Sequence, residues 1–395
     1  AAAAPVPHPY TIDFLKTAVM PRLMIDEGRF KGGVYLSSGD ALGRQNVFVG
    51  LAAAPANGDR DLFAIYEYRG WRPTLFLEAY HQKRGSSRAD STEERGGYVT
   101  GVDYNLYRMA IGGRGRLGRY GELETSVAVD RYDAVVKSDA WQDDPNSSIG
   151  YVRVSQKPYG YTYLKGIDLS LAWRLEKLER RRDREINPRG RRLEVRYDRF
   201  LNYFVEGFNP SANFLDEEYL RLNYGQLAVD WQEHIGLPRS SALSLRGFGG
   251  WIDSDQVDDP ERVRDFFDFR LGGIEYLRGY TFYSLEGRKA AMGSATLRFP
   301  LIEDWGARFL QLYLDKAYAA VYAEAGKAWD RRWDDPDPRY GRKAPVRDVG
   351  GQLRLDLISY YSVPTRVQAD LAYGIDELAD RSPWKAYLTV LFGYL

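Results

Sequence analysis

The chain contains no cysteine and only three histidines, and these scarcities exclude much of protein chemistry. Without thiols it can form no disulfide, no thiolate zinc site and no cysteine nucleophile. An excess of charge of one sign is also missing, because 55 lysine and arginine residues balance 55 aspartate and glutamate residues. A balanced chain has no overall field that would gather nucleic acid, so we expect no nucleic-acid partner and only local electrostatic contacts.

Long apolar runs are absent as well. No segment approaches the roughly 18 consecutive apolar residues of a membrane helix. The chain is rich instead in aromatic residues, with 30 tyrosines, 17 phenylalanines and 9 tryptophans, although its mean hydropathy is a polar −0.48. Amphipathic rings suit a membrane interface better than a soluble core. If the chain crosses a membrane, it must therefore cross with strands.

Apolar and polar residues alternate with a period of two along most of the chain. In RVQADLAY, residues 366–373, one face carries Val367 and Leu371 and the other carries Arg366 and Asp370. A water-soluble β-sandwich also alternates in this way. Three features favour a membrane barrel: opposite charges that neighbour one another on the polar faces, aromatic residues near segment ends, and segments as long as the roughly 9 to 11 residues of a membrane strand.

The pattern predicts an all-β fold, a 16-stranded antiparallel transmembrane β-barrel with the even strand number that closure favours. A lead-in segment, residues 1–10, precedes a barrel over residues 11–395. The longest connection, residues 253–290, is expected to lie outside the cell, and this strand number leaves a lumen wide enough for an inserted loop. The expected strands are residues 11–26, 30–39, 46–55, 61–69, 74–84, 97–110, 121–136, 160–178, 190–204, 216–232, 241–252, 291–301, 314–329, 348–361, 365–376 and 385–395.

One stretch of this connection carries a specific motif. GGIEYLRGYTFYSLEGRKA, residues 272–290, places an arginine between apolar and glycine neighbours, and the strand GSATLRFPL follows soon after it. The stretch resembles the signature of the BamA-type superfamily of outer-membrane assembly and secretion barrels, also called the bacterial surface antigen family. The resemblance implies an extracellular loop that plugs the lumen, with the motif residues Gly272, Gly273, Arg278, Gly279 and Tyr280.

Further segments are similar to the same superfamily. SSGDALGRQNVFVGL, residues 37–51, resembles its turn between the second and third strands. AAVYAEAGKAWD, residues 319–330, resembles the strand after the loop signature, and KAYLTVLFGYL ends the chain in an alternating aromatic strand. The combination of DALGR, LRGY and LRFPL resembles the subgroup whose barrels are fused behind periplasmic propeller-type domains. The chain departs from the pattern at Thr296, where the superfamily often has a carboxylate.

Strand parity predicts partners for the loop arginine. Glu324 alternates with apolar neighbours, so its carboxylate is expected to point into the lumen, and Thr296 and Arg298 are expected to line the same interior. If the loop folds inward, Arg278 can reach Glu324 and form a two-pronged, charge-assisted bond. The alternative is that Arg278 is an exposed loop charge.

The second predicted site is the seam where the first and last strands meet. The resemblance implies that this pairing is short or weak, and unpaired backbone groups there could template strands of a client protein. The edges would be residues 20–26 and 386–395, and the lipid-facing side chains of the last strand would be Leu388, Val390, Phe392 and Tyr394. The alternative is a fully paired seam.

These observations predict a multi-pass barrel of the bacterial outer membrane that assists insertion or translocation of other proteins. The alternative is a plugged anchor that holds a periplasmic or surface domain without translocase activity; a passive pore fits the long inserted loop less well. Expected partners are outer-membrane lipids including lipopolysaccharide, a periplasmic domain or partner subunits, and client outer-membrane or secreted proteins. No nucleophile, base and orienting residue stand in a recognisable motif, so we expect no enzymatic activity, no cofactor and no metal.

Overall fold

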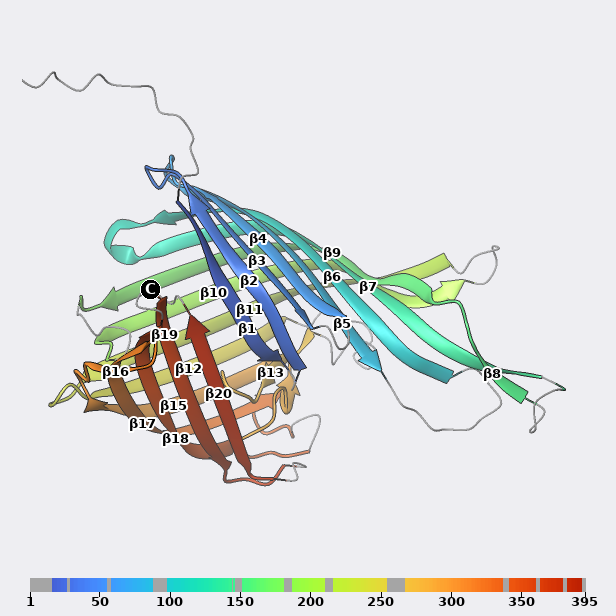
Figure 1. The fold of residues 1–395 in the computed structure, drawn as a ribbon. Coiled ribbons are helices and arrows are strands. Elements are labelled where there is room, and N and C mark those ends of the chain that lie inside the picture. The colour runs from blue at the N-terminus through green and yellow to red at the C-terminus, as the bar shows by residue number, and fades with distance from the viewer. Residues whose placement is uncertain are drawn as a thin grey trace, which may run out of the picture. The chain divides into compact units, whose positions relative to one another are not determined.

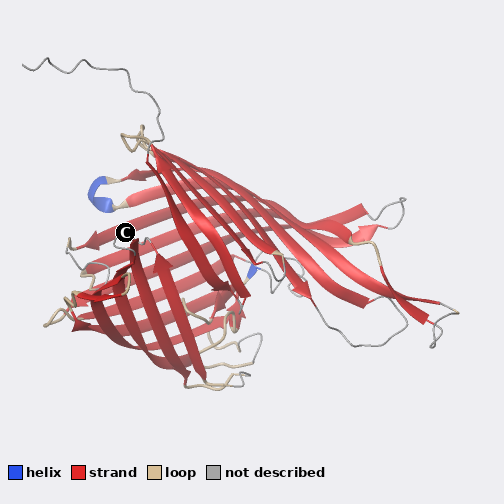
Figure 2. Cartoon of the chain, viewed as in Figure 1, coloured by secondary structure: helices blue, strands red, loops and turns tan. Residues whose placement is uncertain are grey.

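Strands make up almost all of the described protein. The computed structural model describes residues 16–26, 29–54, 58–87, 98–143, 145, 151–180, 187–209, 216–253, 267–336, 341–359, 363–378 and 382–392. Eighteen strands form one antiparallel sheet, and two short strands form a second. Figures 1 and 2 show how far strand structure dominates. The other described element is the short 3₁₀ helix η1 (Gly118–Tyr120). Within the described residues, no helix has the length and apolar character to span a bilayer.

The strands of the first half follow one another along the chain. They are β1 (Lys16–Asp26), β2 (Arg29–Gly39), β3 (Gln45–Ala54), β4 (Asp59–Tyr68), β5 (Thr74–Ser87), β6 (Tyr98–Arg116), β7 (Glu122–Asp143), β8 (Tyr151–Ser155), β9 (Tyr159–Leu178) and β10 (Gly190–Asn209). Each of the strands β1 to β5 pairs with the next as an antiparallel neighbour. Local hairpin connections of this kind are what an alternating chain with short polar turns forms.

The second half continues the meander and contains the long loop. Its strands are β11 (Asp216–Gly236), β12 (Ala242–Asp253), β13 (Phe269–Leu271), β14 (Leu285–Gly287), β15 (Lys289–Ile302), β16 (Ala307–Phe309), β17 (Leu312–Trp329), β18 (Val346–Ser359), β19 (Val363–Gly374) and β20 (Trp384–Phe392). The main sheet runs from β11 through β12, β15, β17, β18 and β19 to β20, while β13 pairs only with β14 inside the loop.

The predicted antiparallel all-β fold is confirmed, and each of the sixteen expected segments coincides with a long strand. The sheet contains eighteen strands rather than sixteen, because β8 and β16 add short pieces that pair with β7 and β17. Some strands also run beyond the predicted ends. β7, expected to end at residue 136, continues to Asp143 and pairs there with β8. Hairpin hydrogen bonds continue there although the apolar alternation has ended, so side-chain pattern alone placed the boundary too early.

The chain divides into two compact units. Unit 1 comprises residues 1–115, 128–165 and 207–217, and unit 2 comprises residues 116–127, 166–206 and 218–395. Unit 1 thus contains β1 to β5, and unit 2 contains β12 to β20 together with the long loop. We describe each unit by itself.

Both units have the polarity that is opposite to that of a water-soluble sheet. On β17 in unit 2, Glu324 is buried while Val321, on the opposite face of the same strand, is 52 % exposed. On β4 in unit 1, Asp61 is 5 % exposed while the adjacent Leu62 is 42 % exposed. A soluble sandwich buries its apolar face and exposes its charges. The exposed apolar face therefore argues against the sandwich and agrees with a sheet built around a polar interior.

Candidate functional site

The loop between β12 and β15 folds back onto the polar face of unit 2. Of the predicted plug, residues 253–290, residues 254–266 lie outside the described residues. From residue 267 onward, β13 and β14 form a small ladder, and the chain between them makes a tight excursion. Gly272 and Gly273 start it with φ values of 113° and 97°, a region that residues with a Cβ rarely adopt. The motif's glycines are thus required by the backbone path.

Arg278, at the tip of this loop, binds Glu324 on β17 through three donors. The backbone N–H of Arg278 donates to Oε2 of Glu324 at 2.8 Å, and Nε and Nη2 donate to Oε1 at 3.2 and 2.8 Å. The side chains are 12 % and 4 % exposed. Because both backbone and guanidinium engage the carboxylate, this contact specifies the position of the loop as well as its charge.

The same guanidinium has a second carboxylate and an aromatic ring around it. Nη1 of Arg278 lies 3.3 Å from Oδ1 of Asp370 on β19, a fully buried side chain. Its Cζ lies 3.3 Å from the ring centroid of Tyr322 on β17. Burial by itself lowers the pKa of Arg278, but the Glu324 carboxylate outweighs it, so the pKa lies above its ordinary value. The loop therefore supplies a permanent positive charge to a wall that carries two buried acids.

Gly279 brings the loop backbone against β18. Its N–H donates to Oδ2 of Asp348 at 3.0 Å. A Cβ at this position would collide with the side chain of Asp348 and with the backbone of Gly374. The residue must therefore be glycine for close approach, which is a different requirement from that of Gly272 and Gly273.

Tyr280 and Tyr387 complete the attachment. The Tyr280 hydroxyl donates to the carbonyl of Arg347 at 2.7 Å and accepts from the N–H of Asp376 at 3.2 Å. From β20, the hydroxyl of Tyr387 donates to the carbonyl of Arg278 at 3.0 Å. The tip thus contacts β17, β18, β19 and β20, four strands that are consecutive in the sheet.

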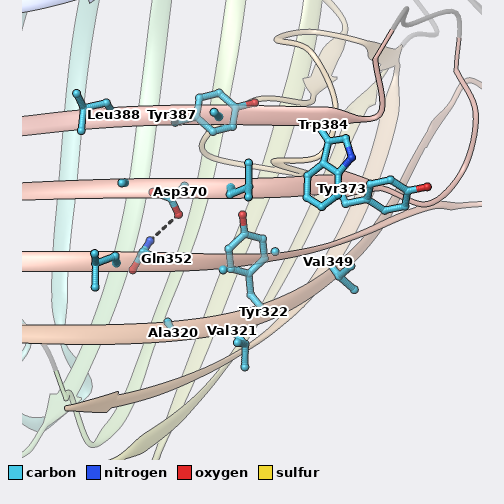
Figure 3. Close-up of a pocket in the computed structure, with 16 residues that line it drawn as sticks. Ala320, Val321, Tyr322, Val349, Gln352, Asp370, Tyr373, Trp384, Tyr387 and Leu388 are labelled. Carbon is cyan, nitrogen blue, oxygen red and sulfur yellow. Dashed lines mark hydrogen bonds between the residues drawn. The ribbon is translucent and has the colours of Figure 1, made fainter. Parts of the chain in front are cut away.

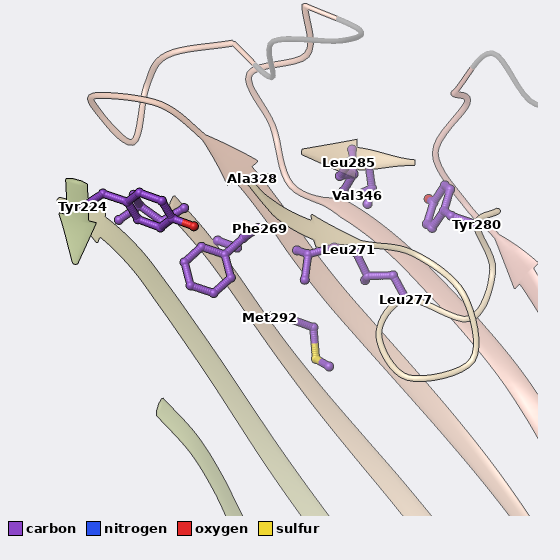
Figure 4. Close-up of a cluster of buried hydrophobic side chains, with 11 residues drawn as sticks. Tyr224, Phe269, Leu271, Leu277, Tyr280, Leu285, Met292, Ala328 and Val346 are labelled. Carbon is purple, nitrogen blue, oxygen red and sulfur yellow. The ribbon is translucent and has the colours of Figure 1, made fainter. Parts of the chain in front are cut away.

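Apolar packing seats the loop beside these polar contacts. Leu277, whose φ is 59°, is fully buried one residue before the arginine. Figure 4 shows that it points into a cluster formed by the loop and the surrounding strands. The cluster comprises Tyr224, Ile252, Phe269, Leu271, Leu277, Tyr280, Leu285, Ala290, Met292, Ala328 and Val346. Burial of these side chains favours the docked loop, since each buried leucine, isoleucine, phenylalanine or methionine contributes about 1.5–3 kcal/mol if fully removed from water.

A second arginine holds the approach to the tip. Arg246 on β12 donates through Nη1 to the carbonyl of Glu275 at 3.1 Å and through Nε to Asp230 at 3.0 Å. Its Cζ lies 4.7 Å from the ring centroid of Tyr276. The loop is therefore fixed from β12 as well as from β17 to β20.

A hollow lies over the strands that hold the tip. Residues from β17 to β20 line it, including Gly350, Gly351 and Trp384, and Figure 3 shows Tyr322, Asp370 and Trp384 around it. A Cβ at Gly350 would collide with Tyr322, so the end of that ring lies directly over the glycine. The stack of Arg278 on Tyr322 thus covers the sheet at a position that has no side chain.

Two residues expected beside the loop arginine have other contacts. Thr296 and Arg298 lie on β15, and Thr296 is buried. Arg298 donates through Nη1 to the hydroxyl of Ser244 at 3.1 Å, whereas the side-chain hydrogen bonds of Arg278 go to Glu324 and Asp370. Sequence reasoning placed Asp370 on a polar face but did not connect it, Asp348 or Tyr387 to the loop. Only strand register, which the motif does not contain, brings them to the tip.

The residues of the predicted seam are placed only in part. On β20, Leu388 is 72 % exposed and Val390 is 38 % exposed, on the face opposite Tyr387. The backbone of Phe392 pairs with Thr365, and Tyr394 lies outside the described residues. Because β1 and β20 belong to different units, the seam stays a prediction. Within the described ranges, no group of three or more histidine, aspartate or glutamate side chains is placed to hold a metal ion.

Comparisons with known proteins identify similar folds. No protein-family model matches the chain, and no curated protein matches it. Among solved structures, BamA from Haemophilus ducreyi lacking POTRA domains 1-3 is similar to this chain, with 11% sequence identity and a TM-score of 0.59. CdiB from Escherichia coli is similar with 14% identity and a TM-score of 0.55. CdiB from Acinetobacter baumannii is similar with 12% identity and a TM-score of 0.51. Each alignment covers 95% of this chain but only 70%, 62% and 59% of those chains, respectively. At these identities the likeness establishes a shared fold.

Removal of the loop arginine should leave two buried carboxylates without their counter-charge. We expect Arg278→Ala to lower the free energy of unfolding by about 3–5 kcal/mol, and Arg278→Lys to recover only part of it. Resistance of the folded band to heat before gel electrophoresis, together with urea unfolding, measures the change. Arg331→Ala, which removes the same charge from an exposed position, is the matched control. Equal stability of Arg278→Ala and Arg331→Ala would contradict the role of the pair.

Close approach at Gly279 makes a separate prediction. Gly279→Ala should displace the tip, because its methyl group has no room between Asp348 and Gly374. Limited proteolysis should then cut within residues 272–284 at least tenfold faster, as expected for a loop released from its contacts. Gly249→Ala on β12 is the control, since nothing lies within 4 Å of a Cβ there. Proteolysis of both variants at the wild-type rate would rule out this account.

Docking of the loop should also depend on acid pH through Asp376, which lies after β19. Burial by itself raises the pKa of Asp376, but hydrogen bonds from Arg347 and the nearby Arg342 outweigh it and hold the pKa below its ordinary value. A carboxyl whose pKa is lowered in the folded state contributes its full stabilisation at pH values above the unfolded-state pKa of about 3.9. This stabilisation is lost as the pH falls through the lower pKa of the folded state. Hydrogen exchange at Tyr280 should therefore rise below about pH 4, and Asp376→Asn should remove this dependence. An unchanged acid profile in the variant would show that another group is responsible.

Proposed function

We propose that this chain belongs to the BamA-type superfamily and assists insertion or translocation of other proteins without covalent chemistry. The observation that carries the proposal is the loop tip, where Arg278 binds Glu324 and the adjacent residues contact four consecutive strands. The loop motif found in the sequence thus forms the expected contact between Arg278 and Glu324. It does so on a sheet whose fold is similar to that of BamA and CdiB. The finer placement, in the subgroup fused behind periplasmic propeller-type domains, rests on the sequence motifs.

The polarity of the sheet supports location in the bacterial outer membrane. Exposed apolar side chains such as Val321, Leu371 and Leu388 would face lipid, including lipopolysaccharide, while the buried acids and arginines line the interior. In water such a surface would be expected to aggregate. In a bilayer the apolar face contacts acyl chains instead of water, so this cause of aggregation is absent.

The proposed action takes place at the edges formed by β1 and β20. An unpaired strand edge offers N–H and C=O groups to which a client strand can add, and hydrogen-bond pairing of this kind needs no particular side-chain sequence. Client outer-membrane or secreted proteins are therefore the proposed substrates. A periplasmic domain or partner subunits would deliver them.

A plugged anchor is the second candidate function, and one observation favours it. The tip is fixed by hydrogen bonds from four strands and by the cluster around Leu277, so the loop is bound firmly in the described structure. A barrel that only holds another domain in the membrane needs such a plug and no mobile seam.

Disulfide locking of the seam separates the two functions. The chain has no cysteine, so one introduced at residues 20–26 and one at residues 386–392 form the only possible disulfide. We expect oxidation of a productive pair to reduce insertion or translocation by reconstituted protein at least tenfold, and reductant to restore it, because client strands can no longer enter between the edges.

The control places the two cysteines at Ala369 and Leu388, which are already paired between β19 and β20. This disulfide should leave the activity unchanged. Full activity in every locked seam variant would show that the seam does not act, and absence of activity in the unlocked protein would favour the anchor.

A further inference from the structure

The polar face of unit 1 carries a row of aromatic side chains. Tyr35, Phe48, Phe63 and Tyr80 come from the four neighbouring strands β2 to β5. Their ring centroids are 5.4 Å apart between Tyr35 and Phe48, 5.4 Å between Phe48 and Phe63, and 6.1 Å between Phe63 and Tyr80. All four rings are half-buried, and we name them the aromatic row. Apolar rings on a face that otherwise buries charges require a reason.

The sheet is shaped to receive the row. The ring of Phe63 occupies the space above Gly50, where a Cβ would collide with it. The rings alternate in tilt, with interplanar angles of 20° for Tyr35 and Phe48, 54° for Phe48 and Phe63, and 30° for Phe63 and Tyr80. The row is therefore a fixed but uneven apolar strip across four strands.

Arg22 on β1 adds hydrogen-bond donors to this strip. Its Cζ lies 5.3 Å from the ring centroid of Tyr35 and 5.7 Å from that of Phe63. Nε and Nη1 of Arg22 are buried and have no hydrogen-bond partner among the described residues. Buried N–H groups without acceptors are costly, so their retention indicates a partner from outside the described residues.

The nearest carboxylate is already shared. Asp61 lies 3.9 Å from Nη2 of Arg22, but it accepts a bond from Nζ of Lys31 at 3.4 Å and also binds Arg84. Because one carboxylate faces three cations, Nε and Nη1 of Arg22 have no acceptor among the described residues. The site thus combines partly exposed ring surface with N–H donors that lack an acceptor.

We propose that the aromatic row and Arg22 form a contact site for an extended polypeptide, a substrate class that rests on the proposed function. Apolar side chains of the polypeptide would pack on the rings. Its backbone carbonyls would accept from Nε and Nη1 of Arg22 after a shift of the Arg22 side chain, because both atoms are covered in this structure. Stacked rings tolerate many side-chain shapes, which suits a site that handles varied sequences. An oligosaccharide fits less well, because its sugar rings stack best on a flat platform and the row is tilted. A free anion is disfavoured by the adjacent Asp61.

The test uses the purified full chain in detergent micelles and a labelled, uncharged 20-residue peptide in which phenylalanine alternates with serine. Fluorescence anisotropy measures binding. Phe48→Leu and Phe63→Leu should each weaken binding about three- to tenfold through lost ring stacking, and Arg22→Met should weaken it about tenfold through lost donors. Phe30→Leu, at an exposed position on the opposite face of β2, should leave binding unchanged. Heat resistance before electrophoresis verifies that each variant is folded.

Three outcomes would overturn the inference. Equal binding by wild type and the row variants would show that the peptide does not contact the row. Equal binding of a peptide with serine in place of every phenylalanine would show that the rings contribute nothing. Row-dependent binding of a linear maltodextrin without row-dependent binding of the peptide would identify a sugar site instead. The seam-locking assay is independent: active transfer with no role for the row defeats this inference alone, whereas row-dependent peptide binding without transfer defeats the proposed function alone.

Discussion

The guanidinium of Arg278, held between Glu324 and Asp370 and stacked on Tyr322, is the interaction on which the rest of unit 2 depends. Buried carboxylates without a counter-charge are unfavourable by several kcal/mol. β17 and β19 nevertheless each present one to the same point. The loop supplies the missing charge, so the wall requires the loop and the loop is positioned by the wall. Gly279, next to the arginine, follows from this constraint, because the backbone passes so close to Asp348 on β18 that a Cβ would collide with it.

The same interaction compensates for a weak part of the sheet. Gly350, Gly351 and several alanines line part of a hollow over β17 to β20. Tyr322 covers Gly350 from the polar side, and Arg278 covers Tyr322 in turn. Tyr387 extends the attachment to β20, the last strand of the sheet. Rigidity close to that edge is therefore supplied by a segment that is remote in sequence, which makes the edge sensitive to whether the loop is docked.

Unit 1 manages its polar face differently. Its described residues form charge clusters around Asp61 and a strip of aromatic rings. Aromatic side chains over glycine stabilise a sheet, which accounts for Phe63 above Gly50. Sheet stabilisation does not account for Arg22, whose buried donors have no acceptor among the described residues. The rings alone would be explained by support of the sheet. The buried donors of Arg22 are the reason to propose that this face also binds a ligand.

The amino-acid sequence by itself determined the strands, because a period of two is a local property that needs no knowledge of the fold. It also determined the loop motif and, through parity, the inward direction of Glu324. Tertiary structure decided the rest. The C-terminal end of β7 follows hairpin hydrogen bonds rather than side-chain pattern, so it lies beyond the predicted residue 136. Asp370, Asp348 and Tyr387 meet the loop only because strand register aligns them, and the aromatic row exists only where four strands lie side by side. Contacts between residues distant in sequence depend on register and on the return of a loop, and neither is encoded in any short segment.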